Sequence, residues 1–223
     1  MIKAILFDLD ETLLDQQGAS SVALREFYRE KCRGMDWEEV ETRWNNCLKY
    51  HFIKYEKGEI TFQQQRRCRI RDIFEDQNIP DDLADELFGT YLKYYEGNYR
   101  LFPEVKELLS QLSHYPLGVI TNGDAHQQLD KLSRMELKIY FKAIVVSEAV
   151  GFRKPDTKIF ELAAKELGVA TNECLFVGDN LEADYKGSAE AGMQAVLINR
   201  RKHNYGDKVM QISNLMEIKN ILP

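Results

Sequence analysis

The chain has 223 residues, of which 44% are hydrophobic and 30% are charged, and its formal net charge is −6. This composition is typical of a globular protein, and the acidic balance argues against a partner bound mainly through nucleic acid phosphates. No apolar run approaches the roughly 20 residues of a membrane-spanning helix, and the four cysteines form no CxxC pair. Because a strand is predicted almost at the first residue, we expect no signal peptide. We therefore expect a cytoplasmic protein that binds neither a nucleic acid polymer nor a membrane.

The first strand ends in two acidic residues. Residues 4–7 are apolar at every position, which predicts a short strand buried on both faces of a parallel sheet. Asp8 and Asp10 follow directly, and residues two apart in an extended segment face the same side. Two neighbouring carboxylates repel each other unless a cation or a shared proton relieves them. This pair is the first indication of a functional site.

Residues 16–98 have a helical pattern without convincing strands. A partial apolar stripe predicts a helix over 20–32, and Asp36 and Thr61 are suitable N-caps for a second and a third helix. Pro80 and the two aspartates after it predict the start of a fourth. Four helices joined by short loops predict a small bundle.

From residue 103 onward, strands and helices alternate. We expect strands at 117–120, 143–146, 174–177 and 195–198, and helices at 104–112, 125–137, 155–167, 181–191 and about 215–221. This alternation predicts an α/β fold with a doubly wound, Rossmann-like parallel sheet. Because the bundle interrupts this pattern after the first strand, we expect a core of residues 1–15 and 100–223 and an inserted helical cap of residues 16–99.

Polar residues follow three of the expected strands and should meet at one edge of the sheet. They are Asp8 and Asp10 after the first strand, Thr121 and Asn122 after the second, and Asp179 after the fourth, with Asp184 on the next helix. Several carboxylates in one crevice favour a hard divalent cation, and Mg²⁺ is the expected choice. Thr121 and Asn122 suit the oxygens of a phosphate, and Lys154 can balance the charge of a transferring phosphoryl group.

The order of these motifs resembles the haloacid-dehalogenase-like (HAD) phosphatase superfamily over essentially the whole chain. The motifs are DxDxT at 8–12, Thr-Asn at 121–122, Lys-Pro at 154–155 and GDNxxxD at 178–184. The helical insertion resembles the type-one cap of that superfamily. Residues 121–124 and 178–182 are similar to the N-acylneuraminate-9-phosphatase and pyrimidine-5′-nucleotidase branches. The resemblance implies a HAD-like core and a phosphoric monoester hydrolase.

The resemblance also implies how the chemical steps are divided. Asp8 would be the nucleophile that forms an aspartyl-phosphate, and Asp10 would protonate the leaving alkoxide and then activate water. Thr121 and Asn122 would bind the transferring phosphoryl group. Lys154 would neutralise charge both on this group and on Asp8.

A metal site is implied as well. Mg²⁺ would be held by Asp8, Asp179 and the backbone carbonyl of Asp10, while Asp184 would either support the metal shell or bind Lys154. The expected substrate is a small phosphate ester, either a nucleotide or a sugar phosphate, and the cap is expected to select it.

Three alternatives stay open at this point. A phosphomutase would keep Asp10 and the metal. A 2-haloacid dehalogenase is disfavoured by Asp10, because a halide leaving group needs no acid. A non-catalytic metabolite-binding regulator would be favoured by loss of Asp8 or Lys154, and both residues are present.

Two features of the cap are interpreted as structural. The aromatic residues of the cap are expected to form the core of the bundle. The four arginines between residues 66 and 71 predict a solvated helix face, although one of them could meet an anionic substrate.

Overall fold

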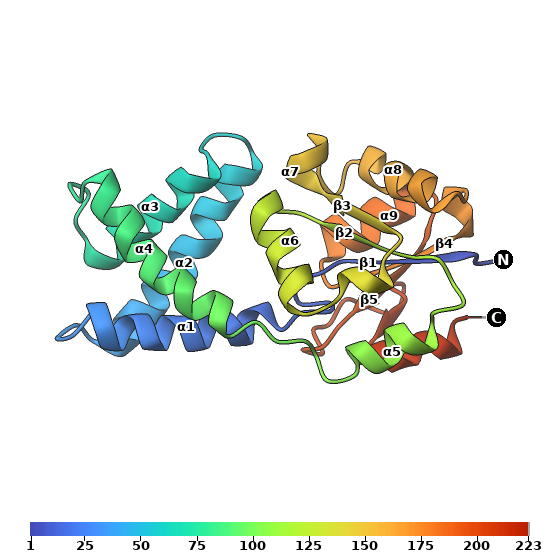
Figure 1. Cartoon of the computed structure of the whole chain (residues 1–223), viewed down its shortest axis with the longest axis horizontal. Helices are drawn as coiled ribbons and strands as arrows, with labels where there is room; N and C mark the ends of the chain where they lie inside the picture. The colour runs from blue at the N-terminus through green and yellow to red at the C-terminus, as the bar shows by residue number, and fades with distance from the viewer. Residues whose placement is uncertain (223) are drawn as a thin grey trace. The chain divides into compact units, whose positions relative to one another are not determined.

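The computed structural model describes residues 1–222 and divides into two compact units (Figure 1). We call the first the core unit; it consists of Met1–Gln16 and the chain from Tyr99 onward. The second, the cap unit, consists of Gln17–Asn98. No helix within residues 1–222 is long and apolar enough to cross a membrane.

The core unit is built on a six-stranded parallel sheet in the order β3-β2-β1-β4-β5-β6. The strands are β1 (Ala4–Phe7), β2 (Leu117–Thr121), β3 (Ala143–Val146), β4 (Cys174–Gly178), β5 (Gln194–Ile198) and β6 (Gln211–Ile212). β1 lies between β2 and β4, and all four of its residues are buried because the sheet is covered on both faces. The predicted fold class is confirmed.

Helices of the core unit connect these strands. They are α5 (Val105–Gln111), α6 (Ala125–Arg134), α7 (Ser147–Val150), α8 (Thr157–Leu167) and α9 (Gly187–Glu190), with shorter helical turns η1 (Lys138–Tyr140), η2 (Thr171–Glu173), η3 (Leu181–Lys186) and η4 (Leu215–Asn220). Ile159 and Phe160 of α8 belong to the same buried cluster as Leu6 of β1 and Phe176 of β4. This packing fixes the central strands and therefore the positions of the residues at their ends.

Several helix boundaries differ from the sequence expectation. The helix expected over 125–137 ends at Arg134, because Glu136 adopts a left-handed conformation with φ 59°. The helix expected from Pro155 begins at Thr157, since the side chain of Asp156 accepts from the Lys158 amide and caps its first turn.

The segment expected as one helix over 181–191 consists of two pieces. η3 is a wide, π-type turn, and α9 follows it directly. The helix expected near 215–221 is the 3₁₀ turn η4, and neither α7 nor β6 was anticipated. All of these elements are short, so that tertiary contacts rather than intrinsic propensity decide their conformation.

The cap unit consists of α1 (Gln16–Lys31, whose first residue belongs to the core unit), α2 (Trp37–Glu56), α3 (Phe62–Phe74) and α4 (Asp81–Gly97). Both predicted N-caps form: Asp36 accepts from the Glu39 amide, and Thr61 forms a reciprocal capping box with Gln64. Aromatic side chains fill the interior of the bundle, but not all of those that were expected there. Trp44, Tyr91 and Tyr95 are buried together with Phe27 and Phe88, whereas the expected Trp37, Phe52 and Tyr94 are partly exposed because they lie at the rim of the bundle.

Candidate active site

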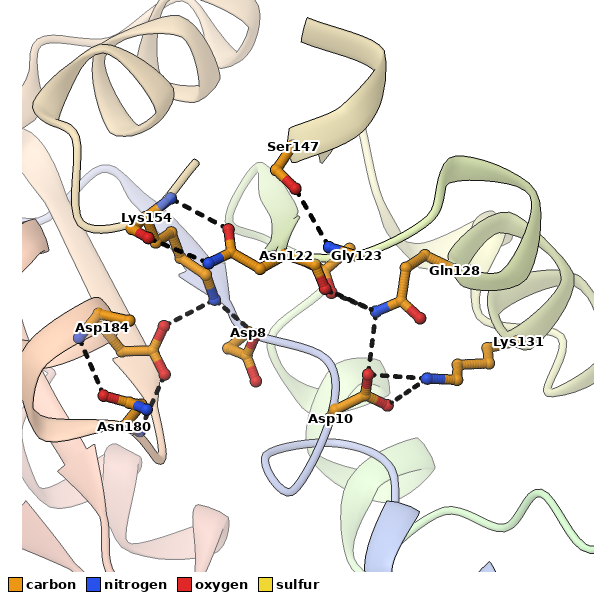
Figure 2. A network of polar contacts seen from close by, with 12 residues as sticks. Asp8, Asp10, Asn122, Gly123, Gln128, Lys131, Ser147, Lys154, Asn180 and Asp184 are labelled. Carbon is orange, nitrogen blue, oxygen red and sulfur yellow. Dashed lines mark hydrogen bonds and ion pairs between the residues drawn. The ribbon is translucent and has the colours of Figure 1, made fainter. Parts of the chain in front are cut away.

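The predicted site residues meet at the carboxyl edge of the core sheet (Figure 2). Phe7, the last residue of β1, lies opposite Val119 of β2 and Val177 of β4. The Asp8 amide donates to the carbonyl of Val177, so the first aspartate is still held by the sheet. The residues at the carboxyl ends of these three neighbouring strands therefore lie at nearly the same height along the strand direction.

Lys154 lies between two buried carboxylates (Figure 2). Its Nζ is 2.6 Å from Asp8 Oδ1 and 2.6 Å from Asp184 Oδ1, and Lys154 itself is 4% exposed. Burial by itself lowers the pKa of Lys154, but the charges of Asp184 and Asp8 outweigh it, and the pKa stays above its ordinary value. Lys154 is therefore a permanent cation beside Asp8.

Asp8, Asp179 and Asp184 form an acidic cluster in which one oxygen of each lies within 4.8 Å of the others. Burial raises the pKa of Asp8 to about 7, although Lys154 lowers it. Burial, followed by repulsion from Asp8 and Asp184, raises the pKa of Asp179 to about 9. With three carboxylates and one lysine, the cluster carries an excess of negative charge, and its all-oxygen donor set fits a hard divalent cation.

The turn after β4 places Asp184 in this cluster. The side chain of Asn180 accepts from the amides of Glu182 and Ala183, and in return the Asn180 amide donates to Asp184 Oδ2 at 2.9 Å. A Cβ atom at Gly178 would overlap the Asp184 carboxyl group, so glycine is needed at this position. The sequence left two roles open for Asp184, and the structure gives it both an ion pair with Lys154 and a place in the acidic cluster.

Asn122 holds the backbone of Lys154. Its Oδ1 accepts from the Lys154 amide and its Nδ2 donates to the Lys154 carbonyl, both at 3.0 Å. The next amide, that of Gly123, donates to Ser147 Oγ at 3.1 Å, which ties the same loop to α7. The side chain of Asn122 thus acts on the position of Lys154, while its expected contact with phosphate stays a prediction.

Asp10 lies outside the acidic cluster, and its carboxylate contacts side chains of α6 instead (Figure 2). Lys131 Nζ lies 2.8 and 2.7 Å from its two carboxylate oxygens, and Gln128 Nε2 lies 3.0 Å from Oδ2. Gln128 and Lys131 are each 2% exposed. We call these two residues the α6 clamp.

The α6 clamp also reaches Thr121. Gln128 Nε2 lies 2.5 Å from Thr121 Oγ1, and the acceptors around it identify this atom as the amide nitrogen. Because the hydroxyl oxygen of Thr121 accepts from Gln128, its own hydrogen is directed elsewhere. Its acceptor within the protein, the carbonyl of Asn122, is distant at 3.4 Å. Thr121 can therefore donate to a phosphoryl oxygen.

Sequence reasoning missed the α6 clamp. Gln128 and Lys131 are three residues apart and so share one helix face, in the helix that begins just after Thr121 and Asn122. Their shared face on this helix is the sequence feature that could have indicated the clamp. The indication is weak, because glutamine and lysine on a helix are usually solvated.

Comparisons with known proteins agree with this geometry. Residues 2–192 match the family model for haloacid dehalogenase-like hydrolases. The chain belongs to this family. It is 32% identical over 208 residues to a glyceraldehyde 3-phosphate phosphatase of Methanopyrus kandleri, a match covering 91% of this chain and 86% of that protein.

Two further relatives extend the comparison. The N-acylneuraminate-9-phosphatase of Homo sapiens is 29% identical over 211 residues, covering 89% of each chain. The putative HAD-hydrolase YfnB of Bacillus subtilis, whose crystal structure contains magnesium, aligns with 99% of this chain and 98% of its own at 26% identity and a TM-score of 0.83. The predicted resemblance is thus confirmed, and this chain is a HAD-like phosphatase with a helical cap.

Proposed function

We propose that this phosphatase hydrolyses a small phosphorylated metabolite in two steps, through a phosphoryl group carried on Asp8 and with Mg²⁺ as cofactor. The observation that supports this proposal best is the division of the aspartates into two environments. Asp8 lies in the acidic cluster beside Lys154, and Asp10 lies in the α6 clamp.

Asp8 is suited to be the nucleophile. Its ion pair with the permanently charged Lys154 favours the ionised carboxylate, which attacks phosphorus. As the new bond between the carboxylate oxygen and phosphorus forms, the bond from phosphorus to the substrate oxygen breaks and the leaving alkoxide departs. Lys154 then neutralises charge on the phosphoryl group as well as on the carboxylate, and Thr121 donates its hydroxyl hydrogen to one of the phosphoryl oxygens.

Asp10 is suited to handle protons. In the first step it gives a proton to the leaving alkoxide, and in the second it takes a proton from the water that attacks the aspartyl-phosphate. The α6 clamp fixes the position of this carboxylate through three hydrogen bonds. Gln128 also holds Thr121, so a single amide sets the distance between the proton-transfer group and the phosphate-binding hydroxyl.

Mg²⁺ would be held by Asp8 and Asp179, with Asp184 beside them and the backbone carbonyl of Asp10 as the expected further ligand. When bound, the ion supplies positive charge that offsets the repulsion between an anionic nucleophile and an anionic substrate. The raised pKa values of Asp8 and Asp179 support this assignment. Burial is their first cause and repulsion from neighbouring carboxylates adds to it, so a bound cation would favour the ionised form of both groups.

The substrate is proposed to be the phosphate ester of a small sugar-like metabolite. The relatives that match over most of their length are named for glyceraldehyde 3-phosphate and N-acylneuraminate 9-phosphate. Both names describe a phosphate on a small hydroxylated carbon chain. Asp10 and its clamp favour phosphoryl transfer over dehalogenation, because an alkoxide leaving group needs a proton and a halide does not.

The decisive experiment measures phosphate release from a panel of sugar phosphates, nucleotides and p-nitrophenyl phosphate, with Mg²⁺ present and after chelation with EDTA. We expect turnover of at least one sugar phosphate, its loss on chelation and its recovery when Mg²⁺ is restored. Turnover that is indifferent to chelation would remove the metal from the mechanism. Release from nucleotides alone would overturn the proposed substrate class.

A further inference from the structure

The four arginines of α3 have different environments. Arg67 is paired with Asp81 and Asp85, and Arg71 bonds to Asp81 and to the carbonyl of Ile79, so both are held at the surface of the cap unit by α4 and the turn before it. Arg69, two residues from each of them, faces the interior of the bundle and is 5% exposed. Because Arg69 is buried, the groups that stabilise its positive charge have to be identified.

Aromatic rings surround the guanidinium group of Arg69. Its Cζ lies 4.0 Å from the ring centre of Trp44, 5.1 Å from that of Phe88 and 5.7 Å from that of Tyr91. These cation–π contacts are made by the faces of the guanidinium plane, so the N–H groups at its edges can still donate hydrogen bonds. On one edge, Nε and Nη2 find no hydrogen-bond acceptor in the part of the chain that the structure describes, which leaves out the side chain of Glu56.

No carboxylate of the described residues is among the groups that act most strongly on Arg69. These groups are Tyr91, which also makes a side-chain hydrogen bond with the guanidinium group, Cys47 and Tyr95, and tyrosine and cysteine side chains are ordinarily neutral near pH 7. Burial raises the pKa of the Cys47 thiol to about 12, and it lowers the pKa of Arg69 from its ordinary, very high value. An arginine stays protonated in proteins, so a buried cation with two unused donors is costly unless a ligand pairs with it.

Two neighbouring side chains have unused polar atoms as well. Gln65 lies one helical turn before Arg69 on the same face of α3 and is 2% exposed, and its Oε1 accepts no hydrogen bond from the described residues. The same holds for the Nε1 donor of Trp44, which is 1% exposed. Among the described residues, the interior of the cap unit therefore contains three buried donors and one buried acceptor without a hydrogen-bond partner, on Arg69, Trp44 and Gln65.

We propose that Arg69, Gln65 and Trp44 form a binding site for a small hydroxy acid within the cap unit. The Nε and Nη2 donors lie on the same edge of the guanidinium plane and fit a carboxylate with two parallel hydrogen bonds. Gln65 Oε1 accepts from a hydroxyl group of the ligand. This ligand is a separate hydroxy acid that acts as an effector of the phosphatase, an inference that rests on the proposed function.

Trp44 provides a direct readout, because it is one of two tryptophans and is in contact with Arg69. In a Trp37→Phe background, we expect D-glycerate to change the emission of Trp44 in a saturable way, whereas glycerol, which has the hydroxyls but no charge, leaves it unchanged. Arg69→Met should weaken glycerate binding by about tenfold or more, which corresponds to losing a charge-assisted pair. Arg67→Met, on the same helix but outside the site, should bind as the parent does.

Stability separates a binding site from a structural arginine. If Arg69 awaits a ligand, Arg69→Met should melt at the same or a higher temperature than the parent in the absence of anions, because it removes an uncompensated buried charge. A marked fall in melting temperature, with unchanged glycerate binding, would make Arg69 a structural residue and overturn the proposal. Should Arg69→Met not fold, Arg69→Lys keeps the charge but lacks the planar fork and should still bind glycerate less tightly.

Kinetics then test the role of the ligand as an effector. If the ligand is an effector, glycerate should alter turnover of p-nitrophenyl phosphate in the parent but not in Arg69→Met. Absence of any glycerate effect on Trp44 overturns the site, whereas absence of phosphate release overturns only the proposed function.

Discussion

Lys154 in the core unit and Arg69 in the cap unit are both buried cations, but their surroundings are opposite. Lys154 has two carboxylates at 2.6 Å, and nearby Lys131 has both oxygens of Asp10 within 2.8 Å. Arg69 has aromatic rings and neutral polar groups. The buried cations Lys154 and Lys131 of the core unit are thus paired with carboxylates before any ligand arrives, whereas the buried cation Arg69 of the cap unit has no carboxylate partner among the described residues.

This difference has a physical explanation. Phosphoryl transfer is the same step for every substrate, so the groups that perform it gain from being preorganised, with their electrostatic partners already in place. A group that recognises a variable part of a ligand gains more if its hydrogen bonds are made only when that ligand is present. We therefore propose chemistry for the core unit and ligand binding for the cap unit, and each proposal can be tested.

The largest effect is expected for Asp8→Asn, which leaves Lys154 with Asp184 as its remaining carboxylate partner. Turnover of p-nitrophenyl phosphate should fall by a factor of about 10⁴ or more, because an amide is a poor nucleophile. The metal-free variant should melt no lower than the parent, since one of three clustered carboxylates is gone. Activity within tenfold of the parent would exclude Asp8 as the nucleophile.

A smaller loss is expected for Lys131→Met, which removes two of the three hydrogen bonds that hold Asp10. We expect kcat to fall about 100-fold while KM changes by less than about threefold, because the clamp acts on the proton-transfer group and not on phosphate binding. Lys131→Arg should recover part of the loss. An increase in KM with unchanged kcat would instead place Lys131 in substrate binding.

Smaller losses of kcat are expected when the side chains that hold the Lys154 backbone and the neighbouring loop are substituted. Asn122→Ala removes both side-chain hydrogen bonds to the Lys154 backbone and should lower kcat about tenfold, which corresponds to about 1.4 kcal/mol of activation free energy. Ser147→Ala, which removes only the acceptor for the Gly123 amide, is the matched control and should cost less. If the two variants are equally active, Asn122 does not position Lys154.

The smallest effect is a pH dependence of stability in the metal-free protein. The pKa of Asp179 is about 9 in the folded chain against 3.8 for the free carboxyl group, so the folded state binds the proton more tightly. Stability is thus fully present below about pH 4 and is lost as the pH rises towards 9.

Melting temperatures at pH 5.5 and pH 8.5 measure this dependence. Without metal, the parent should lose roughly 5 °C more than Asp179→Asn between these two values. Mg²⁺ should remove most of the difference, because it favours the ionised carboxylate. Equal losses in the parent and the variant would show that Asp179 is not the group responsible.

The sequence predicted most of the core site because its residues follow a simple rule. Polar residues at the carboxyl ends of parallel strands converge, and Asp8, Thr121 and Asp179 each follow a strand whose apolar run is unmistakable. The expected helix boundaries were less accurate. The turn that carries Asp184 has a π-type conformation fixed by Asn180, and no propensity predicts such a turn from a helical pattern.

By itself, the sequence determined the order of the five longer strands and of the longer helices, the insertion of the cap and the residues at the strand ends, because these depend on local periodicity and on short motifs. Only the tertiary structure decided which charges are buried and which of them are paired. Lys131 reaches Asp10 across 121 positions of the chain, and Arg69 is distinguished from Arg67 and Arg71 by the helix face that packs inward. Burial and pairing are properties of contacts between distant segments, and no pattern along the chain records them.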